Sequence, residues 1–518
     1  MKALRTLLLL GLAAFMPLAA GARKNPYEKM KEKSEQRYNR NKAKAQKRYE
    51  NARDRANQRY SRALRRAWER YEKQAAHPLP KEEDIPPVVA PIDEPPVVID
   101  RPIEVAPEVV PAPAPPAPQP EPIVAPEPEP LPVVVPEPQP APQPVVEPEP
   151  EPIQTMTFAC FGTPMTVRRP AAGVLSATDS ESIATAWETM AASPEHEAML
   201  ADVLALRSGR RLCDWAYVML VRDLANALYG AGTPDAELLQ AYLLAQSGYV
   251  ARLGITGDRL FAFFGTDHLI YNRGYLSDGP WSLYAISEQV PGDATDWHVA
   301  GAEMPGERPV SLYVGQLPDL SANPAGNRHL ASKAYPAASG DVNESQNLME
   351  FFSSYPTSRL GENHMTRWQQ YANTPLSPAA NALKERLGAA VAGKTPEQAV
   401  NILLNFVQTS LVYEYDDKVW GGDRAFFPDE TLRYPYADCE DRAILFTRLV
   451  RDLLGLKTAL VYYPGHLAAA VEFPEAVAGD YLTVDGRRFT IADPTYINAP
   501  LGASMPGMPP SAATAILL

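Results

Sequence analysis

The chain has 518 residues, 45% of them hydrophobic, and a formal net charge of −13. Only three residues are cysteines, which excludes a disulfide framework, and a chain of this length can bury large cores without one. The charge is segregated: residues 23–76 hold 19 Lys and Arg against 7 Asp and Glu, whereas residues 78–153 hold 15 acidic and 2 basic residues. The average charge therefore says little, and the chain is interpreted segment by segment.

Residues 1–22 have the pattern of a secretory signal peptide. Lys2 and Arg5 precede the apolar run LLLLGLAAFMPLAA, and small residues at 20–22 suit a cleavage site. The apolar run is too short for a comfortable transmembrane helix, and no later stretch of about 18 uncharged apolar residues follows. We therefore expect an exported protein without a transmembrane segment, located in the periplasm, in the cell envelope or outside the cell.

The basic segment, residues 23–77, has a tyrosine every eleven residues, at positions 27, 38, 49, 60 and 71. Eleven residues make about three helical turns, so the rings form one slowly drifting stripe. Pro26 suits a first helical position and no Gly or Pro interrupts the run before Pro78, which predicts one helix over residues 26–76. The stripe has few large aliphatic side chains, so we expect it to stay out of a core.

Two functions of this helix remain open on sequence alone. It is either a solvated spacer, or a basic coiled-coil rod that binds an anionic polymer of the envelope or associates with another copy. Nucleic acid is not expected as a partner. Residues 78–153 follow as a tether: 28 of their residues are prolines, which remove amide donors and fix φ. This segment predicts an extended, disordered Pro/Glu-rich linker without a packed core.

Residues 154–518 carry the globular part, whose length suggests two domains or three. Residues 154–300 start with a strand pattern, continue with helix patterns and end with short strand patterns. Residues 301–375 form a mixed, β-rich connecting region in which PVSLYVGQL (309–317) predicts a strand. Residues 376–518 hold helices followed by several strands. Helices followed by antiparallel-looking strands favour an α+β fold class over repeated βαβ units.

In the last region, YADCEDRAILFTRLVRDLLGL predicts a helix that starts at a cysteine. Asp438 is placed as N-cap, apolar residues repeat on one face, and Gly455 closes the helix. Cys439 then lies in the first turn, where unpaired amides and the helix dipole lower the pKa of a thiol. The carboxylates of Asp438, Glu440 and Asp441 act in the opposite direction. The helix start alone therefore does not activate the thiol, which needs a cationic partner.

His466 and Asp493 are candidates for the other members of a catalytic site. His466 starts a strand directly after a turn, and Asp493 ends another strand just before a proline. At one edge of a sheet, a thiol, an imidazole and a carboxylate form a nucleophile, a base and an orienting group. The histidine takes the thiol proton, the aspartate fixes its tautomer, and the first-turn amide of Cys439 is suited to an oxyanion. Spacing alone does not separate this arrangement from a coincidence of common residues.

Three blocks of sequence resemble the signatures of the transglutaminase-like (papain-like) superfamily. They are PDETLRYPYADCEDRAILFTRLVRDLLGL, PGHLAAAV and DPTY, that is, an acidic–Cys–acidic helix start, a Gly–His strand start and an Asp–Pro–Thr strand end. The resemblance covers about residues 376–500. It implies a catalytic helix against an antiparallel sheet, with Cys439 as nucleophile, His466 as base and Asp493 as orienting residue. In bacterial envelopes, members of this superfamily are more often peptidases or amidases than protein cross-linkers.

The motifs leave other roles unassigned. Candidates for the side-chain oxyanion donor of such enzymes are Tyr434, Tyr436 and Gln408. Three acids upstream of the cysteine helix fit a cleft, a cation site or, more simply, a solvated loop: Asp416, Asp417 and Asp423. No metal-ligand spacing and no phosphate-binding loop is present, so we expect neither metal nor cofactor. Cys160 and Cys213 lie in apolar runs typical of a core.

Residues 200–290 resemble a shorter version of the Cys439 region. TPDAELLQAYLLAQSGYVARLGI matches the cysteine helix and its following strand, with Ala236 at the position of the thiol. One interpretation is a degenerate, catalytically silent copy of the transglutaminase-like domain. The other is that any amphipathic helix followed by strands has this pattern. On either interpretation His268 has no predicted catalytic role.

These features predict an exported cysteine enzyme that transfers acyl groups through a thioester at Cys439. Water is the default acceptor, which makes the protein a peptidase or amidase acting on a protein or peptide in the cell envelope. Two alternatives stay open: a protein cross-linking transglutaminase, and a non-catalytic binding or scaffold protein with a vestigial triad. The intact Cys, His and Asp argue against the vestigial site, since a decaying site usually loses one of them.

Overall fold

The computed structural model describes residues 26–65, 75–77, 102–103, 109–110, 154–171, 175, 179–287, 296–300, 303–420, 424–508 and 513–518. The predicted signal peptide, residues 1–22, lies outside this part. The chain divides into two compact units between Asp54 and Arg55, and the unit that starts at Arg55 holds all the strands described below. Among the described helices, none is at once long enough and apolar enough to cross a membrane.

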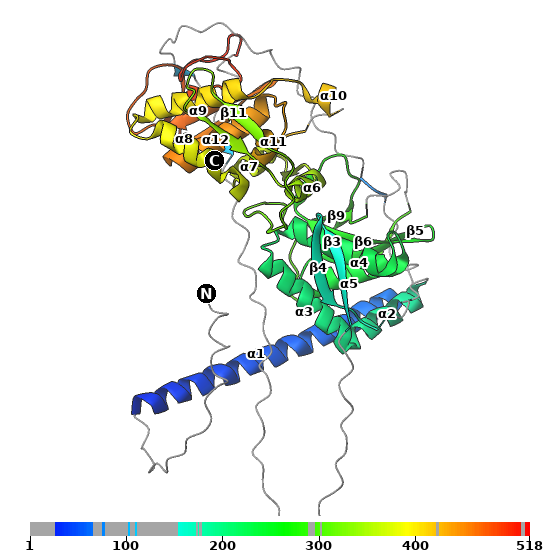
Figure 1. The fold of residues 1–518 in the computed structure, drawn as a ribbon. Helices are drawn as coiled ribbons and strands as arrows, with labels where there is room; N and C mark the ends of the chain where they lie inside the picture. Colours follow the sequence, from blue (N-terminus) through cyan, green and yellow to red (C-terminus); the bar gives the residue numbers. More distant parts are fainter. Residues whose placement is uncertain are drawn as a thin grey trace, which may run out of the picture. The chain divides into compact units, whose positions relative to one another are not determined.

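The basic segment forms helix α1, Pro26–Arg65, and the predicted continuation over 66–74 lies outside the described residues. The expectation that its tyrosine stripe stays out of a core is wrong for its last turns. Tyr60 is 1% exposed and stacks on Trp187 of α2 (Ser180–Ala192), with ring centroids 4.2 Å apart. Figure 1 shows the end of α1 beside α2. Ala56 and Leu64, one turn to either side on the same face, are buried with it. Because Ala56 is small and Leu64 is aliphatic, the Tyr60 ring can lie flat against Trp187.

Polar contacts flank the docked ring of Tyr60. Asn57 Oδ1 accepts hydrogen bonds from Trp187 Nε1 (3.1 Å) and from Gln246 Nε2 (2.7 Å). Arg65 donates from two nitrogens to the carboxylate of Glu188, each at 2.7 Å. The repeat before it, at Tyr49, has glutamine in place of Asn57 and an aspartate in place of Arg65. The polar contacts around Tyr60 therefore come from residues that differ between the repeats.

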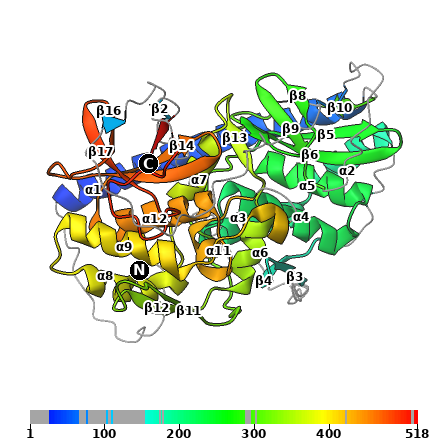
Figure 2. The same ribbon diagram turned by 90° about the horizontal axis from the view of Figure 1, so that it is seen from above.

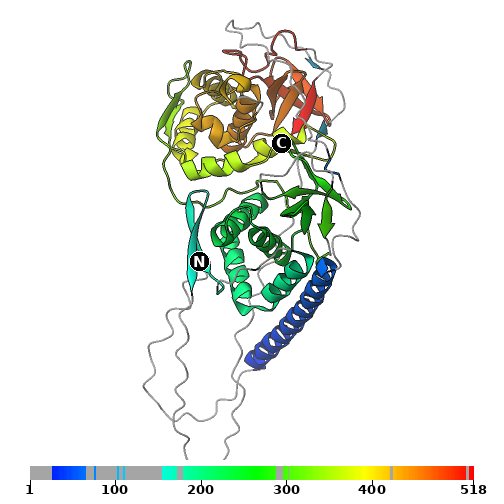
Figure 3. The ribbon, with the colours of Figure 1, turned by 90° about the vertical axis from the view of Figure 1, so that its right-hand side faces the viewer.

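The first globular domain begins with a hairpin, β3 (Thr155–Cys160) and β4 (Thr163–Arg168), which packs against its helices (Figure 3). After α2 come the helices α3 (Pro194–Gly209), α4 (Asp214–Tyr229) and α5 (Pro234–Gln246). The residues of this domain share one hydrophobic core with Tyr60. Cys160 and Cys213 are buried free thiols in that core, as their apolar sequence context predicts.

A five-stranded antiparallel sheet completes the first domain, with the order β10–β5–β6–β9–β8. Its strands are β5 (Ala251–Thr256), β6 (Arg259–Thr266), β8 (Leu276–Asp278), β9 (Trp281–Ala285) and β10 (His298–Ala300). Helix α5 packs on the central pair, β5 and β6. A short strand, β7 (His268–Ile270), leaves this sheet and pairs with β13 (Ser358–Leu360).

The connecting region is not β-rich as predicted. Among its described residues it holds the short hairpin β11 (Arg328–Ala331) and β12 (Ser339–Val342), strand β13, and two helices, α6 (Gln346–Ser354) and α7 (Thr366–Asn373). The strand predicted at 309–317 is wrong, because this segment is irregular. Its alternation is nevertheless meaningful: Val310, Leu312 and Val314 point into the first domain's core. The period-2 pattern arises here because an extended but unpaired segment covers the core, and not because the segment pairs with a neighbouring strand.

The second domain has helices on one side of a curled sheet. The helical elements are η2 (Pro378–Ala380), α8 (Asn381–Val391), α9 (Pro396–Ser410), α10 (Asp416–Val419), α11 (Pro428–Arg433) and α12 (Cys439–Leu454). The strands are β14 (Thr458–Tyr463), β15 (His466–Glu472), β16 (Tyr481–Val484), β17 (Arg487–Ala492) and β18 (Thr514–Leu517). Helix α12 packs against α9 and against β14 and β15 (Figure 2). Helices beside antiparallel sheets agree with the predicted α+β class.

Two dipeptides of the linker belong to the second domain's sheet. β1 (Pro102–Ile103) pairs in parallel with β16, and β2 (Val109–Val110) pairs in parallel with β18. They occupy the two edges of the described sheet, in the order β1–β16–β17–β15–β14–β18–β2. The prediction that all of 78–153 is disordered is therefore wrong at these dipeptides. Sheet edges carry unpaired amides and carbonyls, which an adjacent extended chain satisfies.

The sheets of the two domains share their strand order and directions. In chain order after the helix, the strands lie as fifth–first–second–fourth–third in both: β10–β5–β6–β9–β8 and β18–β14–β15–β17–β16. Each neighbouring pair in both series is antiparallel. The preceding helix, α5 or α12, packs on the first two strands in each case. The degenerate copy remains a proposal, and this shared topology is the observation that supports it.

The register of the two hairpins shows which residues occupy the triad positions in the first domain. The last pair before the turn is Tyr463–His466 in one hairpin and Thr256–Arg259 in the other, so Arg259 stands where His466 does. Continuing along the next strand places Ser287 at the position of Asp493. Helix α5 contains no cysteine. The first-domain positions equivalent to His466 and Asp493 therefore hold no imidazole and no carboxyl group, and the helix equivalent to α12 offers no thiol.

A pair of buried carboxyl groups joins the connecting region to the second domain. Glu344 and Asp429 of α11 are both fully buried, and Ser377 donates its hydroxyl to the first (3.1 Å) and its amide to the second (3.0 Å). Burial, and then the neighbouring Asp429, raise the pKa of Glu344 to about 9. Glu344 therefore holds a proton in the folded protein at neutral pH. In the unfolded chain, with a pKa of 4.5, it does not.

We predict that Glu344→Gln removes a loss of folding stability that the wild-type protein suffers as the pH rises. Since the folded state binds a proton that the unfolded state has lost, stability falls as the pH rises from about 4.5 to about 9. Glutamine cannot ionise and retains the side-chain shape. The variant should gain unfolding free energy relative to wild type as the pH rises across this window, measured by urea denaturation. Glu385→Gln, at an exposed position of α8, is the control and should show no such gain.

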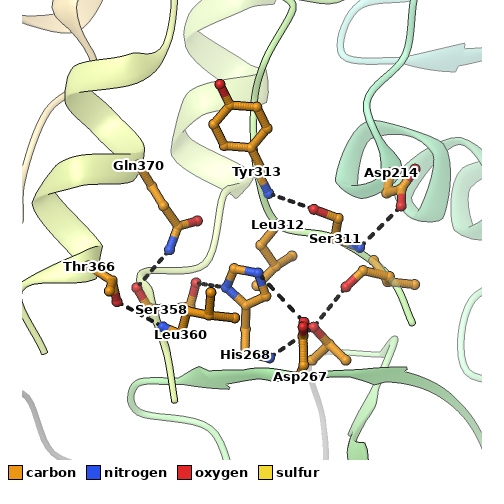
Figure 4. A network of polar contacts seen from close by, with 12 residues as sticks. Asp214, Asp267, His268, Ser311, Leu312, Tyr313, Ser358, Leu360, Thr366 and Gln370 are labelled. Atoms are coloured by element: carbon orange, nitrogen blue, oxygen red, sulfur yellow. Dashed lines mark hydrogen bonds and ion pairs between the residues drawn. The ribbon is translucent and has the colours of Figure 1, made fainter. Parts of the chain in front are cut away.

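A histidine lies buried where β7 meets β13. His268 Nδ1 is 3.3 Å from Ser358 Oγ, and Nε2 is 3.8 Å from Asp267 Oδ1 (Figure 4). Ser358 O in turn accepts from Gln370 of α7. Burial lowers the pKa of His268 to about 4, against a smaller opposing effect of Asp267. The ring is therefore neutral at physiological pH. Through Ser358 it connects the first domain to Gln370 of α7.

We predict that the buried His268 makes the folded protein less stable in acid. Its unfolded pKa of 6.5 exceeds the folded value of about 4, so the unfolded state gains protons first and stability falls as the pH drops through this window. A shift of this size corresponds to a loss of up to roughly 3 kcal/mol. His268→Asn should flatten the fall in thermal unfolding midpoint between about pH 6.5 and pH 4. If the exposed control His329→Asn flattens it equally, His268 is not the cause.

Candidate active site

Helix α12 starts and ends as the sequence predicts. Asp438 is the N-cap in extended geometry, Cys439 is the first helical residue, and Gly455 ends the helix in the left-handed region with φ 65°. The Asp441 carboxylate accepts from the amides of Phe426 (2.8 Å) and Asp438 (3.4 Å). This carboxylate ties the start of α12 to the segment that precedes α11. The position of the thiol is therefore set by buried hydrogen bonds as well as by the helix.

His466 and Asp493 form a buried pair. Nε2 of His466 is 2.8 Å from Oδ2 of Asp493, and both side chains are almost inaccessible to solvent. The other carboxylate oxygen accepts from the amides of Thr495 (2.9 Å) and Tyr496 (3.3 Å). Asp493 is thus held on both oxygens. Nδ1 of His466 is buried and has no hydrogen-bond partner among the described residues, which leaves one ring nitrogen available for chemistry.

The thiol of Cys439 lies at the start of β15. α12 packs on β15, and the amide of Leu467, the residue after His466, is near enough to lower the pKa of the thiol. The side chain is 1% exposed, and Sγ lies 3.7 Å from Glu440 Oε2. Asp493 is near enough to affect the thiol electrostatically. The structure therefore brings all three sequence-predicted residues to one end of the sheet.

The surroundings of Cys439 favour the protonated thiol. Burial raises its pKa well above the ordinary value, and the negative charges of Asp438 and Glu440 add to the rise, while the Leu467 amide opposes it. The neighbouring acids thus act as the sequence indicated, and the helix dipole does not outweigh them. Cys439 is therefore a protonated thiol at rest. In the predicted role of nucleophile it would require a base at the moment of reaction instead of a preformed thiolate.

Of the three oxyanion donors considered from sequence, Gln408 has another role in the structure. Gln408 of α9 donates its amide nitrogen to the carbonyls of Asp493 (3.1 Å), Tyr496 (2.8 Å) and Ala499 (3.0 Å). It therefore holds the loop that carries Asp493. Tyr434 packs in an aromatic cluster with Trp420 and Phe426. Tyr436 is 39% exposed on the surface.

Tyr413, which no sequence motif singled out, lies on a segment beside the approach to the thiol. Val412 forms a parallel bridge with Tyr436, so Tyr413 runs beside the residues that lead into Cys439. The Arg442 guanidinium of α12 is 5.3 Å from the centre of its ring. The hydroxyl oxygen is shielded from solvent and has no partner among the described residues. The signal in the sequence was weak, since an aromatic residue just after a helix is common.

The acidic residues upstream of Cys439 are more structural than the sequence suggested. Asp416 is buried and accepts from the Arg424 amide at 2.7 Å, so the expectation of a solvated loop is wrong for it. The side chain of Asp417 and all of Asp423 lie outside the described residues. Ligand atoms of Asp438, Cys439 and Glu440 lie within 4.8 Å of one another, a set that could hold a divalent ion. The sequence predicted no metal, and no metal-ligand motif marks this group.

No protein-family model matches the chain, and no curated protein matches it either.

We predict that Asp493→Asn disables the histidine. The two backbone amides on Oδ1 require an acceptor there, so asparagine must turn its NH₂ group towards His466. Nε2 then accepts, the proton moves to Nδ1, and the ring can no longer take a proton from the thiol. Alkylation of Cys439 near neutral pH should fall roughly tenfold or more. Asp485→Asn, at an exposed turn, is the matched control, and an equal rate in both variants would contradict the role of Asp493.

Proposed function

We propose that residues 376–518 form a transglutaminase-like thiol enzyme that transfers acyl groups through a thioester at Cys439. The observation that carries the proposal is the His466–Asp493 pair, 2.8 Å apart, whose remaining ring nitrogen is unpartnered at the strand start that contacts the thiol. A buried histidine normally uses both nitrogens when its role is structural. A resting thiol, an oriented imidazole and a fixed carboxylate together form the nucleophile–base–orienter set.

The reaction follows from these positions. As the sulfur attacks an amide carbonyl carbon, Nδ1 of His466 takes the thiol proton, and Asp493 stabilises the imidazolium through Nε2–H. The C–N bond then breaks, and the imidazolium gives its proton to the leaving amine, which leaves an acyl thioester. A water molecule that loses its proton to the same nitrogen attacks the thioester. The products are a carboxylic acid and the restored thiol.

Hydrolysis of a protein or peptide substrate is the favoured outcome, because no feature of the site singles out an amine acceptor. Cross-linking, in which a lysine amine replaces water, uses the same residues and is the first alternative. The second is a binding or scaffold protein in which the triad no longer works. The signal-peptide pattern supports action outside the cytoplasm, in the periplasm, the envelope or beyond.

The N-terminal half is proposed to position this enzyme. The first domain holds the end of α1 through Tyr60 and Asn57 and lacks the triad groups. The exposed basic residues along the helix, among them Arg40, Lys44 and Arg48, suit an anionic envelope polymer or a second copy. The proline-rich segment then links the helix to the catalytic part.

The decisive measurement is the rate at which iodoacetamide alkylates Cys439 as a function of pH. With His466 as base, the wild-type thiol should react near neutral pH in spite of its raised pKa. His466→Ala should react roughly tenfold more slowly there and approach the wild-type rate only well above about pH 9. Mass spectrometry of the intact chain gives the rates.

Cys439→Ser serves as the control, because it reports any alkylation of the buried Cys160 and Cys213. Rates that are the same for wild type and His466→Ala at every pH would refute the Cys–His pair and leave the scaffold alternative. An alkylation confined to Cys439 and dependent on His466 justifies a search for the substrate among envelope peptides.

A further inference from the structure

The hydroxyl of Tyr413 is buried without a hydrogen-bond partner among the described residues. It belongs to the segment that leaves α9, which the Val412–Tyr436 bridge and the hydrogen bond from Ala437 N to Val412 O (3.0 Å) hold beside the approach to α12. Its ring lies against the Arg442 guanidinium on one side and makes an edge contact with Tyr415, 5.5 Å between centroids, on another. The ring is therefore held in place by neighbours that do not use its oxygen.

A buried hydroxyl without a partner is costly, since it loses its hydrogen bonds to water and gains none in return. The groups that act on the Tyr413 hydroxyl identify its surroundings. Burial raises the pKa of Tyr413 most, followed by its electrostatic interactions with Cys439 and then with Asp438. The phenol thus remains protonated at any physiological pH. It is a hydrogen-bond donor close to the nucleophile.

We infer that Tyr413 is the side-chain oxyanion donor of the site. This inference rests on the proposed acyl-transfer function and assigns a catalytic residue that the motifs do not. When Cys439 Sγ bonds to a carbonyl carbon, the π electron pair moves to the carbonyl oxygen, and the thiol proton moves to His466 Nδ1. The phenol O–H then donates to this oxygen, together with the first-turn amide of Cys439. Expulsion of the leaving group restores the carbonyl and ends the contact.

Charge favours a phenol at this position. The start of α12 has three carboxyl groups, so a developing oxyanion there meets negative charge from Asp438 and Glu440. A neutral donor that cannot ionise below alkaline pH stabilises the oxyanion without forming an ion pair with those carboxylates. Arg442 cannot substitute, because its guanidinium already donates to the carbonyls of Gln408, Leu411 and Ala437.

The test compares two reactions of the same thiol in the full-length chain. p-Nitrophenyl acetate acylates Cys439 through an oxyanion and releases p-nitrophenolate, whereas iodoacetamide alkylates it by direct displacement with no oxyanion. Tyr413→Phe removes one oxygen atom and retains the ring contacts. It should slow acylation roughly 10- to 1000-fold and leave alkylation within about twofold of wild type. Tyr415→Phe, the neighbouring phenol, is the matched control and should change neither rate.

Each other result overturns the assignment. If acylation by Tyr413→Phe matches wild type, the hydroxyl is not the donor. If acylation and alkylation fall together, Tyr413 supports the thiol or the fold and does not act on the oxyanion. If wild-type Cys439 is alkylated in a His466-dependent way but is never acylated, or is not alkylated either, the acyl-transfer function itself fails and the role of Tyr413 fails with it.

Discussion

The guanidinium of Arg442 connects the segments that build the candidate site. It is almost fully buried in the first turns of α12 and donates to the carbonyls of Gln408, Leu411 and Ala437. These carbonyls belong to the end of α9, to the segment before Tyr413 and to the approach to Cys439. Burial lowers the pKa of Arg442 to about 10, yet it remains charged at neutral pH. Burying a guanidinium charge is costly unless hydrogen bonds compensate for the lost water. The positions of the three carbonyls around Arg442 are therefore strongly specified.

From this centre, a chain of hydrogen bonds reaches the carboxylate of Asp493, the proposed orienting residue. Gln408, whose carbonyl Arg442 binds, donates its own side-chain amide to the loop after β17, including the carbonyl of Asp493. Asp493 in turn holds His466. The orientation of the imidazole therefore depends on α9 and α12 as well as on the sheet. A site that must keep a neutral thiol and a base in register gains from such rigid support.

The two globular domains show how one topology serves different purposes. Both place a helix on an antiparallel sheet with the same strand order. In one, the helix starts with a thiol that faces a histidine strand. In the other, the helix contains no thiol, Arg259 takes the histidine position, and the far end of the helix contributes Gln246 to the contact with α1. The first domain holds the end of α1, and the linker dipeptides at the sheet edges tie the chain to the second domain.

The sequence by itself determined what local chemistry decides: the bounds of α12, from the Asp438 cap to Gly455, the strands at His466 and Asp493, and the α+β class. Cap residues, glycine in the left-handed region and period-2 patterns act within a few residues. Only the tertiary structure decided that Tyr60 docks on Trp187. It also decided that the side-chain amide of Gln408 donates to three carbonyls and that the Tyr413 hydroxyl lies near the thiol. These contacts join residues whose types are common and whose partners are distant in sequence, so no local pattern marks them. Burial, which raises the pKa of Cys439, arises in the same way from packing that composition does not reveal.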